Sequence, residues 1–375
     1  MKIERISVYT VDLPYVGSRK DRQGGGSYEW GKGYVIRTGC TYVVRIDTDD
    51  GVTGWGEVCP IGSNYAKAFP LGVPAGVAQL APLLIGKDPT KIGMINAIMD
   101  DQLMGQEYVK TPIDVACWDI LGRSLNAPVH ALLGGRQYDK MPMYRVIPMD
   151  DPKDVPDEMD RLREQGYFQF QVKVGRDPEV DATRVRLACE NLKPGEKIFA
   201  DANRGWRRDQ ALRFVSLTKG LYFFLEQPCT DYHDCLAVRR KAEQPVKLDE
   251  SLENVDAMLR AFQDDACDEM CIKISRVGGL TKARQMRDLA ATRGLPMTVE
   301  DAWGAEIVTA ALGHLAASTP VGFLMNTTDL QNYNTVSLGS RPAEGRNGYL
   351  TINDAPGIGV EPDMSVLGEP VAVHT

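Results

Sequence analysis

The amino-acid sequence predicts an α/β fold: a (β/α)7β TIM-type barrel with an α+β N-terminal capping domain that the C-terminal tail completes. The first observation is that short apolar segments after residue 140 alternate with charged, amphipathic segments at intervals of about 25 residues, the length of one strand-helix unit. The second is that eight such apolar segments occur, the number that closes a parallel barrel. No glycine-rich phosphate-binding turn follows the first of them, which disfavours an open, doubly wound sheet.

The region before this alternation has a different pattern. Alternating apolar residues predict three strands, at 3–13, 34–47 and 53–58. Helical patterns follow, and in the one near residue 111 we expect Thr111 to cap the helix and Pro112 to take its first position. Gly134-Gly135 then interrupts the chain. We therefore expect three parts: a capping domain at 1–135, a barrel domain with the catalytic site at 136–340, and a tail at 341–375 that packs on the capping domain.

The barrel strands are expected where apolar residues cluster. The eight predicted strands are 143–147, 168–174, 198–201, 222–226, 246–249, 270–274, 297–300 and 322–326. Amphipathic stretches such as 182–191 and 255–263 separate them and are predicted to be helices. In such barrels the catalytic residues stand at the carboxyl ends of the strands. The strand ends are therefore the places to look for a site.

Composition narrows the class of protein. The chain has 375 residues, of which 43% are hydrophobic and 25% charged, and a formal net charge of −8. These values are typical of a globular protein, and no apolar run is long enough for a membrane span. The acidic balance disfavours nucleic-acid partners. The first residues alternate and carry charge, unlike a signal peptide. We expect a cytoplasmic enzyme with no membrane or nucleic-acid partner.

Three acidic residues end consecutive predicted strands. Asp201, Glu226 and Asp249 end the third, fourth and fifth strands, so their carboxylates are expected at one rim. Carboxylates placed together repel unless a cation compensates them, and all-oxygen ligands suit Mg²⁺. Asp249 is preferred to Glu250 as the third ligand because adjacent strand residues face opposite ways. The four histidines show no zinc-binding spacing.

Two lysines are predicted to face each other across the barrel. Lys173 ends the second strand and Lys273 the sixth, four strands apart in a barrel of eight. A carboxylate substrate on the metal would then have its α-carbon between two amines, one of which removes the α-proton. A nearby dication and partial burial are expected to lower the pKa of the lysine that acts as the base.

The motifs together resemble one known family. Gly54-Trp55-Gly56-Glu57, Asp114-x-Ala-Cys-Trp-Asp119 and Leu132-Leu-Gly-Gly135, with the strand ends, resemble the mandelate racemase and muconate lactonizing enzyme branch of the enolase superfamily over the whole chain. The resemblance implies a capping domain over a (β/α)7β barrel, one Mg²⁺, an enediolate intermediate and a homo-oligomer. It also implies ligand roles for the three carboxylates above and acid/base roles for the two lysines.

The chain departs from many relatives at Gln171, where a first lysine is common, and strand 7 has no terminal His. Val299-Glu300-Asp301-Ala-Trp303-Gly304 and the ends of strands 3 and 6 look like the group acting on proline derivatives. Relatives usually have Gly-Gly-Asp where this chain has Gly304-Ala305-Glu306. We favour dehydration of cis-3-hydroxy-L-proline, with 2-epimerisation of proline betaine or hydroxyproline betaine as the alternative. Dipeptide epimerase, acyl-amino-acid racemase, muconate cycloisomerase and a non-catalytic barrel rank lower.

The remaining expectations concern substrate contacts. Trp303 at the barrel mouth would hold an ammonium by cation–π contact, with Asp301 adding negative charge; the other interpretation is a packed Trp and a helix-capping Asp. Trp30 follows a glycine-rich stretch that suits a lid over the site, or only an exposed loop. Tyr65 is also expected at the mouth. Three further residues are expected to support the catalytic groups from behind: Gln171, Asn203 and Glu250.

Overall fold

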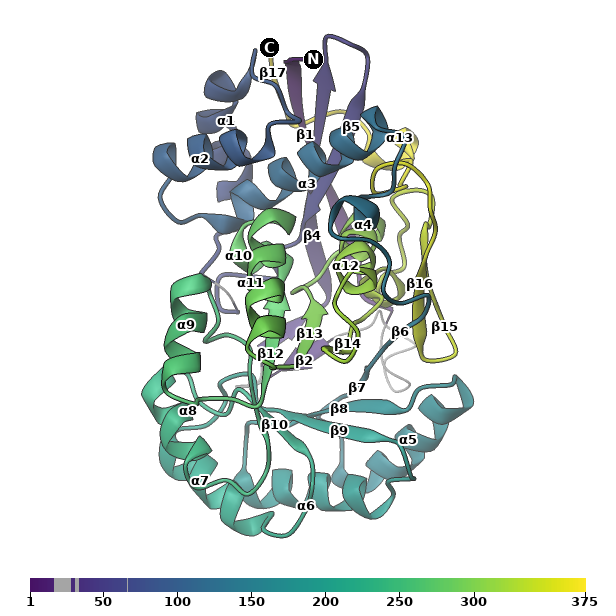
Figure 1. The fold of residues 1–375 in the computed structure, drawn as a ribbon. Coiled ribbons are helices and arrows are strands. Elements are labelled where there is room, and N and C mark those ends of the chain that lie inside the picture. Colours follow the sequence, from purple (N-terminus) through teal and green to yellow (C-terminus); the bar gives the residue numbers. More distant parts are fainter. Residues whose placement is uncertain (17–27, 31–33, 66) are drawn as a thin grey trace.

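The computed structural model describes residues 1–16, 28–30, 34–65 and 67–375 (Figure 1). Its N-terminal part is a four-stranded antiparallel sheet in the order β17-β1-β4-β5, with helices packed beside it. The elements are β1 (Ile3–Pro14), β4 (Thr38–Thr48), β5 (Thr53–Val58), α1 (Gly72–Leu84), α2 (Ile92–Gln102), α3 (Glu107–Ser124), α4 (Val129–Leu132) and β17 (Ala372–His374). The short strands β2 (Tyr28–Trp30) and β3 (Tyr34–Ile36) pair with each other.

Helix α3 begins earlier than predicted. Its first residue is Glu107, so Pro112 lies inside the helix and Thr111 is no cap. The Thr111 hydroxyl instead donates to the carbonyl oxygen of Glu107 one turn back, at 2.9 Å, and to that of Ser275 at 3.2 Å. The cap-and-proline pattern was misleading because packing against the residues after β12 extends the helix toward its N-terminus.

Eight parallel strands form the second part, in the order in which they occur along the chain (Figure 1). They are β7 (Arg145–Ile147), β8 (Gln169–Lys173), β9 (Lys197–Asp201), β10 (Phe224–Glu226), β11 (Val246–Leu248), β12 (Glu269–Lys273), β13 (Met297–Glu300) and β14 (Leu324–Asn326). A parallel bridge between Met143 and Thr327 joins the two edges of the curled sheet. The predicted α/β barrel is therefore confirmed, although β7 begins two residues later than expected because Met143 forms this bridge.

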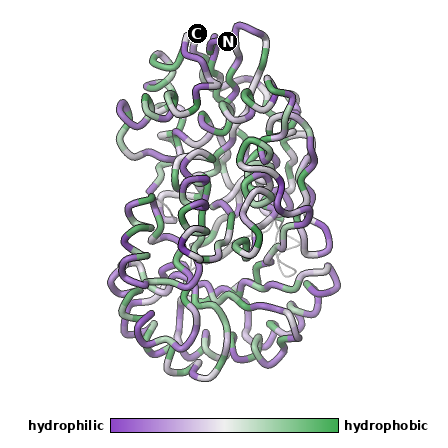
Figure 2. The backbone as a smooth tube through the Cα atoms, in the orientation of Figure 1, coloured by the Kyte–Doolittle hydropathy of each residue, from purple (hydrophilic) through white to green (hydrophobic). Residues whose placement is uncertain are grey.

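Helices connect successive strands and cover the outside of the sheet (Figure 1). They are α5 (Val155–Glu164), α6 (Pro178–Glu190), α7 (Arg208–Leu217), α8 (Tyr232–Arg239), α9 (Val255–Gln263), α10 (Ile274–Val277), α11 (Leu280–Thr292) and α12 (Glu306–Ala317), with the 3-10 turns η1 (Pro152–Asp154) and η2 (Leu330–Tyr333). Hydrophilic and hydrophobic residues alternate along the peripheral helices (Figure 2), the pattern of helices with one face on a core. Among the described residues, no helix is both long and apolar enough to cross a membrane.

The residues after the barrel divide between two surfaces. Strands β15 (Ala343–Arg346) and β16 (Tyr349–Ile352) form a sheet with β6 (Met141–Pro142) beside α12. After α13 (Met364–Leu367), β17 pairs with β1 at the edge of the N-terminal sheet. Residues of the tail thus contact the barrel through β15 and β16 and the N-terminal sheet through β17.

Buried carboxylates of the N-terminal part hold the barrel helices. Glu57 at the end of β5 accepts hydrogen bonds from the backbone nitrogens of Ala305 (2.8 Å) and Val308 (3.0 Å), at the start of α12. Asp114 in α3 accepts one from the nitrogen of Thr281, at the start of α11, at 3.0 Å. These contacts use free N–H groups of the first helical turn. They fix the N-terminal part over the end of the barrel at which β12 and β13 finish.

Candidate active site

Both predicted lysines line one cavity at the carboxyl ends of the barrel strands. Lys173 at the end of β8 donates to Asp201 Oδ2 at 2.5 Å and to Asn203 Oδ1 at 3.0 Å. Lys273 at the end of β12 donates to Asp249 Oδ2 at 2.9 Å. Strands β8 and β12 are four apart in the sheet order, so the amines approach the cavity from opposite walls.

The charges around Lys273 favour the protonated form of its amine. Its amine lies 3.4 Å from Glu300 Oε1 and also donates to the hydroxyl of Tyr65. Burial acts to lower the pKa of Lys273, but the carboxylates of Asp249 and Glu300 outweigh it and raise the pKa well above its usual value. A dication bound among these carboxylates would oppose this shift, so the lowered pKa expected for a base beside a dication stays a prediction. Unless further positive charge is bound nearby, Lys273 is an ammonium group.

The three predicted carboxylates are buried at adjacent strand ends. The register pairs Asp201 of β9 directly with Glu226 of β10, and Asp249 follows β11. Burial raises the pKa of Glu226 well above its usual value, despite the opposing charge of Lys247. Burial also acts to raise the pKa of Asp249, but Arg276 and Lys273 lower it well below the ordinary range. The Glu226 carboxyl therefore resists ionisation, whereas the Asp249 carboxylate is held ionised.

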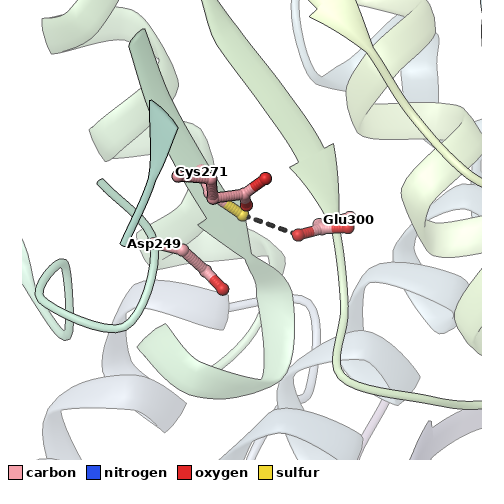
Figure 3. A group of neighbouring side chains, drawn as sticks. Asp249, Cys271 and Glu300 are labelled. Atoms are coloured by element: carbon pink, nitrogen blue, oxygen red, sulfur yellow. Dashed lines mark hydrogen bonds between the residues drawn. The ribbon is translucent and has the colours of Figure 1, made fainter. Parts of the chain in front are cut away.

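Among the described residues, a group of potential metal ligands differs in membership from the predicted triad. Single ligand atoms of Glu226, Asp249, Cys271 and Glu300 lie within 4.8 Å of one another. Figure 3 shows Asp249, Cys271 and Glu300 gathered between neighbouring strands, with Cys271 Sγ donating to Glu300 Oε1 at 2.8 Å. Asp201 is not in this group; its Oδ2 accepts from Lys173 and its Oδ1 from the backbone nitrogen of Asn203.

The donor set fits a hard cation. Glu226 Oε1 is buried and accepts no hydrogen bond among the described residues; its nearest charge is the Lys247 amine at 3.2 Å, and a cation bound to this oxygen would have to displace that amine. Burial raises the pKa of the Cys271 thiol well above its usual value, and a protonated thiol is a poor metal ligand. The oxygens of the surrounding carboxylates remain, and oxygen ligands suit Mg²⁺.

Gln171, Asn203 and Glu250, which the sequence predicted to support the catalytic groups, form polar contacts within the site. Gln171 Nε2 donates to Glu226 Oε2 at 3.1 Å from its place on β8. Asn203 Nδ2 lies 3.3 Å from Glu250 Oε1, so Asn203 bridges Lys173 and Glu250. Burial and the neighbouring Asp249 raise the pKa of Glu250 to about 7. Besides Asn203, Glu250 Oε1 lies 3.5 Å from Nε of Arg204.

Of the predicted substrate contacts, three line the cavity. Trp303 Nε1 donates to Asn334 Oδ1 at 2.8 Å, which fixes the indole ring at the cavity wall. Asp301 accepts from the backbone nitrogens of Ser275 (2.9 Å) and Ala302 (2.7 Å), and burial raises its pKa to about 6. Its carboxylate is therefore occupied by backbone contacts. Tyr65 contacts Lys273 through its hydroxyl.

Trp30 lies at the end of β2, and its backbone pairs with Tyr34. Its side chain, and the glycine-rich stretch before it at 24–27, lie outside the described residues. The expected lid role of Trp30 therefore stays a prediction.

Several residues of the site were not singled out from the sequence. Glu300, Cys271 and Lys247 each stand on an inward-facing strand position, and Lys247 lies 3.2 Å from Glu226 Oε1. The sequence spacing could have identified two of them. Cys271 lies two residues before Lys273, and Lys247 two residues before Asp249, so each shares a strand face with the later residue. Tyr144, which donates to Glu300, lay inside the predicted strand 143–147, but no residue singled out from the sequence lies on that strand to mark its inward face.

Comparison with known proteins assigns the family. A model described as "Enolase C-terminal domain-like" matches residues 154–366, and one described as "Mandelate racemase / muconate lactonizing enzyme, N-terminal domain" matches residues 36–134. A cis-3-hydroxy-L-proline dehydratase of Roseibium aggregatum is 43% identical over 375 residues, covering 100% of both chains. An N-succinyl-L-Arg/Lys racemase of Bacillus cereus is 28% identical and covers 98% of both.

Solved structures agree with these matches. A mandelate racemase/muconate lactonizing enzyme from Roseovarius nubinhibens superimposes with a TM-score of 0.94 at 46% identity, covering 100% of this chain and 98% of the other. A second protein from the same organism, complexed with magnesium, gives a TM-score of 0.94 at 34% identity, covering 100% of both chains. The chain belongs to the mandelate racemase/muconate lactonizing enzyme family of the enolase superfamily.

Proposed function

We propose that this protein is a Mg²⁺-dependent dehydratase that removes the α-proton of a proline-type carboxylate, with cis-3-hydroxy-L-proline as its substrate. The observation that carries the proposal is the pair Lys173 and Lys273, which reach one cavity from opposite walls with buried carboxylates on the strands between them. The 43% identity to a cis-3-hydroxy-L-proline dehydratase over the full chain supports the choice of substrate.

The stereochemistry of this substrate suits two opposed amines. In a cis-3-hydroxyproline the hydroxyl and the carboxylate lie on one face of the ring, so the α-proton lies on the other. One lysine takes the α-proton from its face, and the opposite lysine gives a proton to the departing hydroxyl. The C–H and C–O bonds break, a C2=C3 double bond forms, and water leaves. Two catalytic groups on one wall would not serve this geometry.

We propose Asp201, Glu226 and Asp249 as the residues that hold Mg²⁺. Held by these residues, Mg²⁺ would supply positive charge to balance the negative charge that develops on the substrate carboxylate as the α-proton leaves. Gln171 orients Glu226 by its hydrogen bond, and Asn203 orients Lys173. The ring of Trp303 provides a flat wall for the substrate's ammonium group, since the indole is fixed by Asn334.

The alternative reaction is 2-epimerisation of a proline betaine. It uses the same two lysines, because one amine removes the α-proton and the other returns a proton to the opposite face. The racemases and epimerases among the relatives keep this alternative open. A substrate without a β-hydroxyl can only follow this course.

A substrate screen distinguishes the two reactions. The Mg²⁺-loaded enzyme is incubated in D₂O with cis-3-hydroxy-L-proline, its trans isomer and proline betaine, and each mixture is followed by ¹H NMR. We expect loss of the β-hydroxyl from the cis isomer only. Deuterium incorporation and inversion at the α-carbon with the hydroxyl retained would replace the dehydratase by an epimerase.

We further propose that the enzyme acts in the cytoplasm as a homo-oligomer without nucleic-acid or membrane partners. All eight cysteines are free, as in proteins of reducing compartments. Light scattering of the purified protein measures the oligomeric state, and a monomer at micromolar concentration would contradict this part of the proposal.

A further inference from the structure

Residues 62–65 of the N-terminal part reach into the mouth of the barrel. Tyr65 is 5% exposed and lines the active-site cavity, where its hydroxyl accepts from the Lys273 amine. That amine also lies 5.0 Å from the centroid of the Tyr65 ring. Tyr65 lines a second cavity of about 200 Å³ as well, so it belongs to a wall that the two cavities share. The position of Tyr65 therefore affects both the amine and the closure of the active-site cavity.

The segment at 62–65 has little regular structure of its own. It lies in no helix or strand, and Ser63 and Asn64 are exposed. The backbone makes one turn, in which the Tyr65 amide donates to the carbonyl oxygen of Gly62 at 3.1 Å. This hydrogen bond shapes the turn but does not fix its place on the barrel. Contacts with barrel residues have to hold it there.

Arg204, in the loop after β9, makes such contacts. Its Nη2 donates to the carbonyl oxygen of Tyr65 at 2.6 Å and to that of Asn64 at 3.3 Å. The guanidinium carbon lies 5.9 Å from the centroid of the Tyr65 ring. On the barrel side, Nε of Arg204 lies 3.5 Å from Glu250 Oε1. The planar guanidinium, with donors on several edges, thus joins the barrel to the turn at 62–65.

The loop that carries Arg204 is itself held in place. Arg204 has a φ of 63° and Asn203 a φ of 41°, values that residues other than glycine seldom adopt. The surrounding structure sustains them, since the amide of Arg204 donates to the carbonyl oxygen of Gln227 at 2.9 Å. Asn203 contacts Lys173 directly, and the next residue along the chain contacts Tyr65. Adjacent residues of one loop thereby reach the surroundings of both lysines.

An ion pair also joins this region to the barrel, between Lys67 and Glu253 at 2.8 Å. Its side chains are 84% and 40% exposed, and exposed pairs of this kind contribute little. The Arg204 side chain is 24% exposed and donates to backbone oxygens, so it is the stronger tie.

We propose that Arg204 is a positioning residue that holds Tyr65 in the shared wall and, through Tyr65, keeps the Lys273 amine in place. Held there, Tyr65 separates the amine from the second cavity. The consequence for catalysis rests on the proposed function of Lys273, whereas the contact of Arg204 with the turn does not.

Amide hydrogen exchange of the substrate-free full chain, followed by mass spectrometry, tests the contact. The Tyr65 amide is the reporter, because its hydrogen bond protects it only while the turn stays formed. We expect exchange at least about tenfold faster in Arg204→Met, the scale of one lost hydrogen bond to a charged group, and an intermediate rate in Arg204→Lys. Arg207→Met is the matched control, since the Arg207 side chain is 73% exposed and pairs with Asp209.

Equal exchange of the Tyr65 amide in Arg204→Met and the unmodified protein would overturn the proposal. Faster exchange that spreads through β4 and β5 would overturn it too, because the effect would then be general unfolding.

Turnover of cis-3-hydroxy-L-proline tests the consequence for Lys273. We expect Arg204→Met to lower kcat and kcat/KM by the same factor, about tenfold, as for a misplaced reacting group, and Arg204→Lys to recover part of the loss. An unchanged kcat together with faster exchange would overturn the link to Lys273. Faster exchange of the Tyr65 amide in a protein that does not dehydrate this substrate would refute only the proposed function.

Discussion

Gly56→Ala places a methyl group where the backbone of α3 already lies. An ideal Cβ at Gly56 would stand 1.9 Å from the carbonyl oxygen of Pro112, and ordinary contact begins near 3.4 Å. Strand β5 and α3 must therefore separate by more than an ångström, although neither atom belongs to a flexible side chain. Overpacking of this kind costs typically about 1–3 kcal/mol. We expect the upper end, because α3 is buried on nearly every face and is tied to α11 through Asp114.

Urea unfolding followed by circular dichroism measures this cost. About 3 kcal/mol corresponds to roughly 4 °C in the melting temperature of a chain of this length. Gly93→Ala is the matched control: it lies in α2, and a Cβ there would meet nothing within 4 Å. This control should gain up to about 1 kcal/mol from helix propensity. Equal stability of Gly56→Ala and the unmodified protein would refute the close approach of β5 and α3.

Three further predictions concern catalysis and pH. Lys173→Ala and Lys273→Ala should each lower kcat by about 10²- to 10⁴-fold, whereas Lys219→Ala at the surface should not; steady-state rates that match the unmodified enzyme would exclude the lysine roles. A chelator should abolish activity and Mg²⁺ restore it, and Glu226→Gln should weaken Mg²⁺ binding in calorimetry by more than about tenfold; unaltered affinity would remove Glu226 from the ligands. Burial lowers the pKa of His314 from 6.5 to about 3, so the unfolded chain binds the extra proton. The contribution of His314 to stability should therefore fall by about 3 kcal/mol as the pH drops from 6.5 to 4, and this loss should be missing in His314→Gln; identical pH dependence of the two proteins in urea unfolding would contradict this.

The barrel was predictable because its evidence is local. Each strand is a short apolar run, and the repeat of about 25 residues sets the topology. Strand β13 even has the expected bounds, Met297–Glu300. The start of α3 was not predictable, because Thr111 and Pro112 form a valid start signal that long-range packing overrides. The pairing of β16 with β6 likewise depends on contacts between residues about 200 positions apart in the chain.

The same contrast between local and long-range evidence applies to the candidate site. Residues at strand ends, such as Lys173 and Asp201, could be found because the barrel fold dictates where strand ends meet. Glu300 was present in a quoted motif, yet its contact with Lys273 became visible only through the register of β12 and β13. The occupation of Asp301 by backbone nitrogens depends on a turn geometry that sequence does not reveal.

The central claim is that one of the two lysines acts as the base and the other as the acid, and variants of each lysine test it most directly. Lys173→Ala and Lys273→Ala are each incubated with cis-3-hydroxy-L-proline and Mg²⁺ in D₂O, and ¹H NMR follows exchange of the α-proton and loss of water separately. We predict that one variant loses both reactions, because it lacks the base, and that the other still exchanges the α-proton but releases no water, because it lacks the acid. Dehydration at the unmodified rate in either variant would contradict the account.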